Sequence, residues 1–89
     1  MSSARWRVST TTAFDRDLRK LDREVQRRIV AYLEELERLD DPRQRGKGLT
    51  ADHAGIWRYR VGDYRILTRI DDVAVTVLAL RVGHRSTVY

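Results

Sequence analysis

The sequence predicts an α+β fold: a small single domain, residues 1–89, with two N-terminal helices packed on one face of an antiparallel sheet, in the order β-α-α-β-β-β. Apolar residues recur with helical spacing from Phe14 to Leu36. After Gly55 the pattern changes to alternation, and two-residue turn signals divide this last part into strands. A chain of this length has room for one modest core, so we expect one domain.

Composition restricts the class of protein. A hydrophobic content of 42% favours a folded chain. Without cysteine the chain has no disulfide, thiolate metal ligand or thiol nucleophile. The N-terminal stretch lacks the apolar region of a signal peptide, and no run approaches the roughly 18 apolar residues of a membrane span. We therefore expect a cytoplasmic protein without a membrane partner.

The net charge of +5 is concentrated in one half of the chain. Residues 1–41 hold nine basic and nine acidic side chains, whereas residues 42–89 hold nine basic and four acidic ones. A biased nucleotide composition can explain why only Lys20 and Lys47 are lysines, but it does not explain this segregation. The basic half indicates a polyanionic partner, either nucleic acid or an acidic protein.

The first half of the chain predicts a strand and two helices. Residues 5–9 alternate in polarity and predict a short strand. Thr10-Thr11-Thr12 offers hydroxyl groups for a helix cap, and Asp15 three residues after Thr12 is typical of a helix start. Apolar residues then fall at 14, 18, 21, 25, 29, 33 and 36. A single helix here would be about 40 Å long, which is too long for this domain. We therefore predict a helical hairpin that breaks near Asp22, which would cap the second helix.

Residues 43–55 predict a loop, because they follow Asp40-Asp41-Pro42 and combine three glycines with no apolar period. Arg45 and Lys47 lie in this loop. They are either ordinary solvated side chains or contacts to a nucleic acid.

Three strands and two tight turns are predicted after Gly55. The strands are Ile56–Val61, Tyr64–Ile70 and Val73–Val82, and the turns are Gly62-Asp63 and Asp71-Asp72. Two-residue turns fix the register of the strands that they join. The pairs they predict include Arg60 with Arg65, Arg58 with Leu67, Ile70 with Val73, Leu67 with Thr76, and Arg65 with Leu78.

This register sorts the side chains of the sheet onto two faces. The core face holds Trp57, Tyr59, Val61, Tyr64, Ile66, Ile70, Val73, Val75 and Val77. The other face holds Arg58, Arg60, Arg65, Leu67, Arg69, Thr76, Leu78, Leu80 and Val82. Like charges directly opposite each other, as in Arg60 and Arg65, are destabilising, and a phosphate between them would turn repulsion into attraction. We interpret this face as a nucleic-acid site; alternatively, the arginines are solvated and cover apolar surface with their stems.

The closing segment VGHRSTVY, residues 82–89, supplies His84, Arg85 and Tyr89, which we expect beside the same face. Imidazole is the usual acid or base near neutral pH, so His84 is a candidate for that role, although an isolated surface histidine is usually inert. Tyr89 can stack on a base or donate a proton, unless it is a frayed end.

The element order, the segment WRYRVGDYRIL and the closing VGHRSTVY resemble the RelE/ParE superfamily of bacterial type II toxins. The resemblance covers nearly the whole chain, and its most specific parts are GDYRI (62–66) and VGHRSTVY (82–89). It implies a RelE/ParE-like, microbial-ribonuclease-like fold. It also implies RelE-like activity, in which mRNA is cut in the ribosomal A site without a metal or other cofactor, by attack of the ribose 2′-hydroxyl on the adjacent phosphate.

The resemblance further implies roles for single residues. Arg65 and Arg85 would clamp the scissile phosphate and stabilise the charge of the transition state. Tyr89 would orient the base or assist proton transfer. Arg58 and Arg60 also match basic positions of the family and would bind RNA phosphates. From the register and the loop, we expect Arg69 on the same face and Arg45 and Lys47 in the loop to bind phosphates as well.

The chain departs from the best-known RelE toxins at Arg58 and Arg60, where those toxins have lysines. Arginine in effect cannot lose its proton and so cannot serve as a base. Either His84 or Tyr89 supplies the base, or the acceleration rests on electrostatics and on RNA geometry that the ribosome imposes.

The resemblance implies a cognate antitoxin, the ribosome and mRNA as partners, with operator DNA bound only through the antitoxin. Two alternatives stay open: a ParE-like inhibitor of DNA gyrase without nuclease activity, and an RNA-binding module without catalysis. The presence of Arg65, Arg85 and Tyr89 favours the RelE-like activity.

Overall fold

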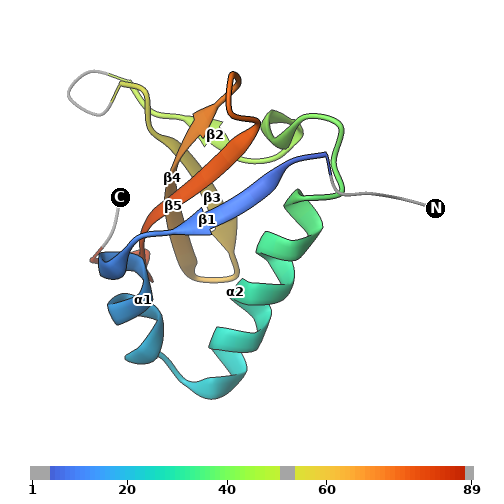
Figure 1. The fold of residues 1–89 in the computed structure, drawn as a ribbon. Helices are drawn as coiled ribbons and strands as arrows, with labels where there is room; N and C mark the ends of the chain where they lie inside the picture. Colours follow the sequence, from blue (N-terminus) through green and yellow to red (C-terminus); the bar gives the residue numbers. More distant parts are fainter. Residues whose placement is uncertain (1–4, 51–53, 88–89) are drawn as a thin grey trace.

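The computed structural model describes residues 5–50 and 54–87 (Figure 1). The elements in chain order are β1 (Arg7–Thr10), α1 (Thr12–Arg19), α2 (Arg23–Leu36), the 3-10 helix η1 (Pro42–Gln44), β2 (Lys47–Gly48), β3 (Trp57–Val61), β4 (Tyr64–Asp71) and β5 (Thr76–His84). The strands form one sheet in the order β1-β5-β4-β3-β2. This is an α+β fold with the predicted order of main elements, so the predicted fold class is confirmed.

The sheet is antiparallel from β2 through β5, but β1 joins its other edge parallel to β5. No tight turn connects β1 to its neighbour, so the sequence carried no signal for its direction. The Val8 N–H, which points away from β5, donates to Glu37 Oε2 over 2.9 Å. This bond satisfies a main-chain donor that the edge strand would otherwise expose.

The predicted break between the helices is confirmed, since α1 ends at Arg19 and Asp22 caps α2, although without a hydrogen bond from its side chain. The cap of α1 is Thr11, one of the three threonines that the sequence offers for this role. Its Oγ1 accepts a hydrogen bond from Phe14 N at 3.0 Å and donates to Leu80 O of β5 at 2.8 Å. The start of α1 is therefore fastened to the last strand. Within the described residues no helix is long and apolar enough to cross a membrane.

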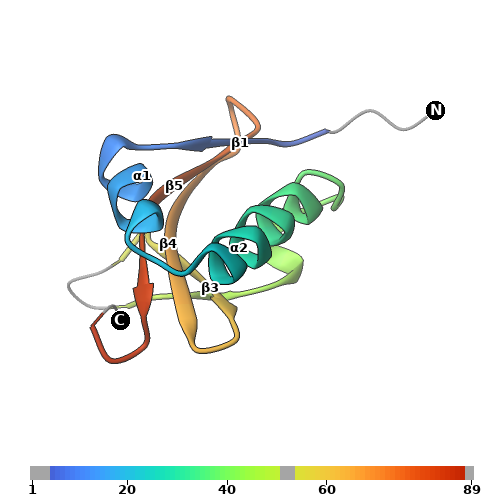
Figure 2. The same cartoon turned by 90° about the horizontal axis from the view of Figure 1, so that it is seen from below.

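The core lies between the helices and the sheet, and α2 occupies the concavity of the curved sheet between β1 and β3 (Figure 2). The helices contribute the buried side chains Phe14, Ile29, Leu33 and Leu36, and the strands contribute Tyr59, Val61, Ile66, Val77, Ala79 and Val82. The Tyr59 hydroxyl reaches through this core to donate to Pro42 O at 2.7 Å. This bond ties η1 to β3.

The first turn, Gly62-Asp63, is confirmed, and with it the pairing of Arg60 with Arg65 and of Arg58 with Leu67.

The second turn was predicted wrongly, because it contains four residues, 72–75, so that Asp71 pairs with Thr76. The Asp71 carboxylate accepts hydrogen bonds from the N–H groups of Val73 and Ala74, each at 3.0 Å, and so organises a wider turn. Val73, predicted in the core, is 96% exposed at the tip of this turn. The predicted pairing of Ile70 with Val73 therefore fails.

A bulge in β5 leaves Leu80 without a partner on β4. The extra residue reverses the faces to which the following side chains point. Val82, predicted on the arginine face, is 2% exposed and belongs to the core. Beyond the bulge Gly83, and not Leu78, lies opposite Arg65.

The predicted loop of residues 43–55 is interrupted by η1 and by the short strand β2, which pairs with β3 through Lys47 and Arg58. Gly46 makes this possible. Its φ of 81° lies in the left-handed region, and a Cβ there would lie 2.6 Å from both Arg58 O and Trp57 Nε1. The chain passes too close to β3 for any side chain at this position.

Candidate nucleic-acid interface

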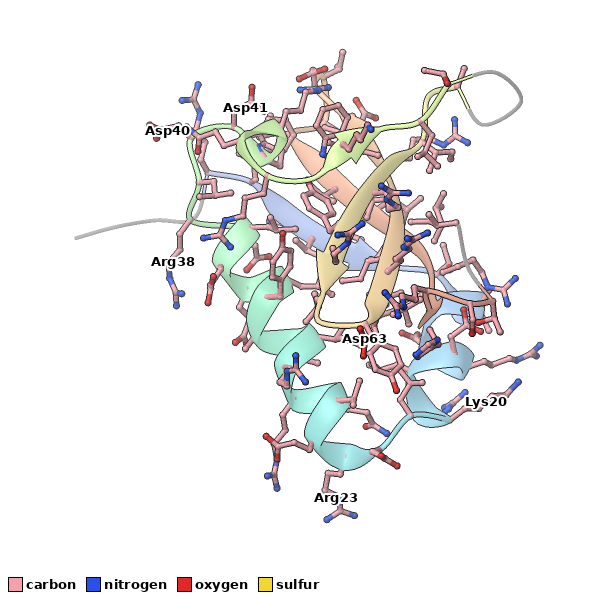
Figure 3. The ribbon with its side chains drawn as sticks, turned by 180° about the vertical axis from the view of Figure 1, so that it is seen from behind. Lys20, Arg23, Arg38, Asp40, Asp41 and Asp63 are labelled. Atoms are coloured by element: carbon pink, nitrogen blue, oxygen red, sulfur yellow. The ribbon has the colours of Figure 1, made fainter. Side chains whose placement is uncertain are left out.

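Four arginines lie together on the outer side of the sheet. Arg58 and Arg60 come from β3, Arg65 from β4, and Arg85 directly follows β5. Arg60 and Arg65 are opposite each other, as predicted. Seen from behind, side chains that end in nitrogen gather over β3 and β4 (Figure 3). We call Arg58, Arg60, Arg65 and Arg85 the arginine cluster.

No carboxylate of residues 5–50 and 54–87 lies within 4.0 Å of a nitrogen of the arginine cluster. The acid nearest in sequence, Asp63, occupies the turn between β3 and β4 (Figure 3). It contributes its main-chain carbonyl, which accepts a hydrogen bond from Arg85 N at 2.8 Å. Asp63 therefore positions Arg85 through the backbone, and its carboxylate does not form an ion pair with the Arg85 guanidinium.

Arg65 occupies the centre of the cluster. Its Nε is buried and, within the described part of the chain, has no hydrogen-bond partner. Desolvation lowers the pKa of Arg65, and repulsion from Arg58, Arg60 and Arg85 lowers it further. Arginine nevertheless stays protonated at neutral pH. A cation that is partly desolvated and surrounded by other cations is a strong site for an anion such as phosphate.

The cluster continues toward the sheet edge into a pocket of about 310 Å³, lined by Tyr32, Gly46, Lys47, Arg58 and Arg60. Lys47 lies beside Arg58 because β2 pairs with β3 in that register. Arg60 belongs both to this pocket and to the pair with Arg65. Lys47, Arg58 and Arg60, each predicted to bind RNA phosphates, therefore line one pocket.

Two predicted RNA contacts lie in different surroundings. The Arg45 guanidinium pairs with Glu35 at 2.8 Å and stands 5.4 Å from the centre of the Tyr32 ring. Its charge is therefore partly neutralised within the protein. Arg69 is exposed on β4 near Gly55 and is not among the groups that shift the pKa of Arg65.

His84 does not lie on the face where it was expected. It pairs with Tyr64, so it points to the opposite face from the neighbouring pair of Gly83 and Arg65. Its ring meets the Tyr64 ring edge-on at 5.5 Å. Its Nδ1 lies 3.2 Å from Ser86 N and 2.9 Å from Ser86 Oγ. The bulge in β5 causes this error, because it reverses the faces of the residues that follow.

Tyr89, to which the sequence assigned base stacking or proton transfer, lies outside the described residues. Of the described residues, no three or more of His, Asp and Glu are grouped so that they could hold a metal ion. Tyr32 is the lining residue that sequence reasoning missed. It stands outside the apolar period of α2, and it adjoins the cluster because its ring packs against Tyr59 of β3.

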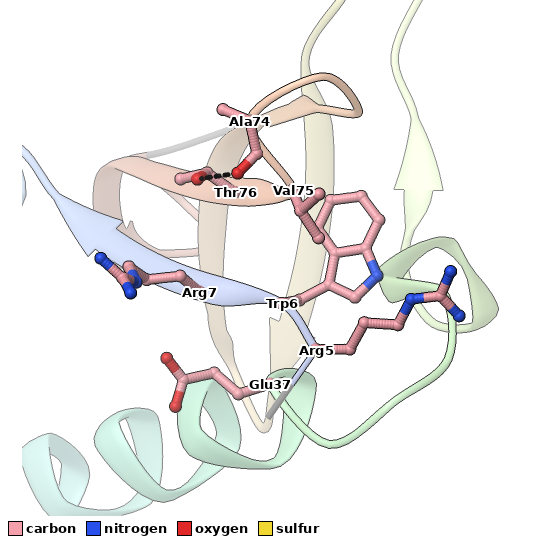
Figure 4. Close-up of a pocket in the computed structure, with 7 residues that line it drawn as sticks. All are labelled: Arg5, Trp6, Arg7, Glu37, Ala74, Val75 and Thr76. Atoms are coloured by element: carbon pink, nitrogen blue, oxygen red, sulfur yellow. Dashed lines mark hydrogen bonds between the residues drawn. The ribbon is translucent and has the colours of Figure 1, made fainter. Parts of the chain in front are cut away.

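A second pocket, of about 410 Å³, lies where β1, the end of α2 and the turn before β5 meet (Figure 4). Its lining residues are Arg5, Trp6, Arg7, Glu37, Ala74, Val75 and Thr76. Thr76 Oγ1 donates to Ala74 O at 3.0 Å. No residue of the arginine cluster contributes to it.

Four arginines outside the cluster have an acid within 4.0 Å in the described residues: Arg27, Arg43, Arg45 and Arg81. The closest match is Arg81, whose Nε and one terminal nitrogen donate to Asp17 over 2.7 and 3.1 Å. Val82 N donates to the same carboxylate at 3.1 Å. The hydrogen bond from Arg81 is the main cause of the lowered pKa of Asp17. Arg43 likewise meets Asp72 at 2.7 Å.

Comparisons with known proteins agree with this architecture. The family described as "ParE toxin of type II toxin-antitoxin system, parDE" matches residues 8–89. Toxin RelG of Mycobacterium tuberculosis is 41% identical over 83 residues, which are 92% of this chain and 93% of RelG. Toxin RelE of the same organism is 31% identical over 84 residues, 94% of this chain and 86% of that toxin.

The fold is also found in a solved structure. A chain of the M. tuberculosis toxin–antitoxin complex RelBE2 superimposes with a TM-score of 0.84 at 38% identity, covering 96% of this chain and 97% of that one. Sequence and structure agree over nearly the full length, and the chain belongs to the RelE/ParE superfamily of type II toxins.

Proposed function

We propose that this toxin is a ribosome-dependent endoribonuclease that cleaves mRNA and thereby inhibits translation. The observation that carries the proposal is Arg65, whose partly desolvated cation lies among three further arginines with no carboxylate within 4.0 Å in the described residues. A fold alone gains nothing from this arrangement, because like charges repel. The successive phosphates of a bound RNA segment would compensate these charges.

In the proposed reaction, the 2′-hydroxyl oxygen attacks the adjacent phosphorus and the bond to the 5′-oxygen of the next nucleotide breaks. The products are a 2′,3′-cyclic phosphate and a 5′-hydroxyl end. Negative charge builds up on the phosphorane-like transition state, where Arg65 and Arg85 would stabilise it more strongly than in the ground state. Arg58 and Arg60 would hold the flanking backbone.

Proton transfer is assigned outside the arginine cluster, because arginine cannot accept a proton at neutral pH. The face of the sheet on which His84 lies argues against it as the base. We propose that Tyr89 orients the base or assists the transfer, with ribosome-imposed RNA geometry supplying part of the acceleration. The chain's own cations provide the charge stabilisation, so we propose a metal-independent reaction without a cofactor.

We propose a cognate antitoxin as the second partner, with operator DNA bound only through it, and the cytoplasm, where ribosomes and mRNA are found, as the site of action. An acidic antitoxin segment that covers the arginine cluster, or a helix that displaces Tyr89, would neutralise the toxin. Covering would be wrong if Arg65→Ala and Arg85→Ala removed toxicity and left antitoxin affinity unchanged.

Mapping mRNA 5′ ends after adding the protein to translating ribosomes tests the activity. We expect new ends inside codons, bearing 5′-hydroxyls, and no cleavage of an mRNA that carries a 2′-deoxyribose at the cut position. Tyr89→Phe should slow cleavage. Intact mRNA together with inhibition of gyrase supercoiling would instead establish the ParE-like alternative, and RNA binding without either effect would establish a plain binding module.

A further inference from the structure

The pocket between α2 and β3 has a composition that suits one nucleotide. Three of its lining residues are cations, Lys47, Arg58 and Arg60, and Tyr32 supplies an aromatic surface. The lining contains no acid. Its volume of about 310 Å³ lies within the range of small-ligand sites.

The pocket is held in shape by packing that does not depend on a ligand. The Trp57 indole donates to Arg45 O at 2.8 Å, and Gly46 lies directly against Trp57 and Arg58. These contacts fix β2 on β3, so that Lys47 and Arg58 stand side by side. The two cations are therefore pre-positioned for one anion.

Tyr32 is also fixed. Its ring meets the Tyr59 ring edge-on, with centroids 5.8 Å apart, and Arg45, anchored by Glu35, lies over it. The ring still lines the pocket beside the cations. An aromatic ring next to cations that bind a phosphate is the usual arrangement for holding a single-stranded nucleotide.

We propose that this pocket, lined by Tyr32, Lys47, Arg58 and Arg60, binds the RNA nucleotide next to the scissile phosphate. Lys47 and Arg58 hold its phosphate, and the Tyr32 ring packs against its base. The inference rests on the proposed function and deepens it, because it specifies the path of the RNA backbone across the sheet.

The position of Arg60 indicates this path. It lines this pocket and also lies opposite Arg65, so it joins the two phosphate positions. The RNA backbone accordingly runs across the strands, from Arg65 and Arg85 at β4 and β5 toward Lys47 at β2. Tyr32 and Lys47 thereby become residues that position the substrate, and neither touches the reacting atoms.

A binding titration tests the site without requiring cleavage. The probe is a single-stranded RNA hexamer with 2′-O-methyl riboses, which lacks the attacking hydroxyl. The two tryptophans are internal reporters: Trp57 borders Gly46 of the pocket, whereas Trp6 donates to Asp40 O at 3.0 Å beside the second pocket. In ¹H–¹⁵N spectra the Trp57 indole signal should shift on titration and the Trp6 signal should stay in place.

Substitutions in the pocket extend the test. Lys47→Gln changes an exposed side chain, so we expect it to leave the fold intact. It should weaken binding about three- to tenfold at low salt and make the slope of log K against log salt shallower by about 0.7. Tyr32→Leu should weaken binding about fivefold. Lys47→Arg and Tyr32→Phe are matched controls that should bind nearly as well as the wild type. Arg23→Gln, which removes an exposed charge at the start of α2, should also leave binding unchanged.

The outcomes separate this inference from the proposed activity. Weakened binding and a shallower salt slope for Lys47→Gln support the site even if ribosome-bound mRNA stays intact, in which case the proposed activity fails alone. Wild-type binding by both Lys47→Gln and Tyr32→Leu, or a shift of the Trp6 signal in place of Trp57, overturns the site whether or not the wild type cleaves mRNA.

Discussion

Two groups of arginines in this protein have opposite surroundings. Those that join one element to another each meet an acid at 2.7 or 2.8 Å: Arg43 with Asp72, Arg45 with Glu35, and Arg81 with Asp17. Those of the arginine cluster meet none among the described residues. Acidic side chains therefore pair with the arginines that connect two elements of the fold, and not with those of the arginine cluster.

The comparison separates stability from function. A paired arginine satisfies its own charge and contributes little beyond its contacts. In the unpaired cluster the arginines repel one another, and a bound polyanion removes this repulsion. The cluster therefore contributes to the free energy of binding and not to the free energy of folding. Substitutions in the two groups should therefore affect different measurements.

The largest expected effect is loss of activity in Arg65→Gln. Removing the central cation should lower kcat on ribosome-bound mRNA about 100-fold or more, because transition-state charge loses its stabilisation. The Tm should be unchanged or higher, since three repulsive contacts disappear. Arg81→Gln is the matched control and should keep its kcat while lowering the Tm. If both variants lost activity equally, the division into two groups would fail.

Asp17→Asn should cost stability and leave activity unchanged. The Asp17 side chain is only 13% exposed and accepts hydrogen bonds from Arg81 and from Val82 N. We expect the free energy of unfolding to fall by about 1 to 3 kcal/mol in urea titrations at pH 7. Asp15→Asn, at an exposed position of the same helix, should cost less.

The same carboxylate predicts a pH dependence. The pKa of Asp17 is lowered in the folded protein from an ordinary value of 3.8. Its contribution is therefore fully present above pH 3.8 and is lost as the pH falls through the folded pKa. Urea titrations below pH 4 should show Asp17→Asn approaching the stability of the wild type. A constant difference from pH 7 to pH 2 would contradict this assignment.

The smallest expected effect is a gain in RNA affinity in Glu35→Gln. This change removes the acidic partner of Arg45, so that the Arg45 charge beside the pocket is no longer paired. Affinity for the methylated RNA hexamer should rise about two- to threefold at low salt, with a steeper salt dependence. Stability should change little, because both partners are exposed. Unchanged affinity would mean that Arg45 lies beyond the reach of the RNA.

The sequence predicted the cluster where local signals determine geometry. Gly62-Asp63 is a two-residue turn, and such a turn fixes the pairing of Arg60 with Arg65. The second turn was missed because the Asp71 side chain widens it. Alternation alone also cannot reveal a bulge, so the faces of Val82 and His84 were predicted wrongly.

The pocket beside the cluster was beyond sequence reasoning for a different reason. Tyr32 and Lys47 are 15 positions apart on different elements. They share a pocket only because Gly46 packs against β3, a contact that depends on the finished fold. The sequence does show a glycine between Arg45 and Lys47, but glycines between basic residues are equally common in ordinary loops.

The bond between Thr11 and the carbonyl of Leu80 has a consequence for synthesis on the ribosome. It joins positions 69 residues apart, and β1 pairs with β5 over a similar separation. Translation delivers the N-terminal part first, so β1 has no neighbouring strand, and the Thr11 hydroxyl no acceptor at Leu80, until β5 has been made. The nascent chain therefore closes its sheet only after the strand that leads to Arg85 has been made.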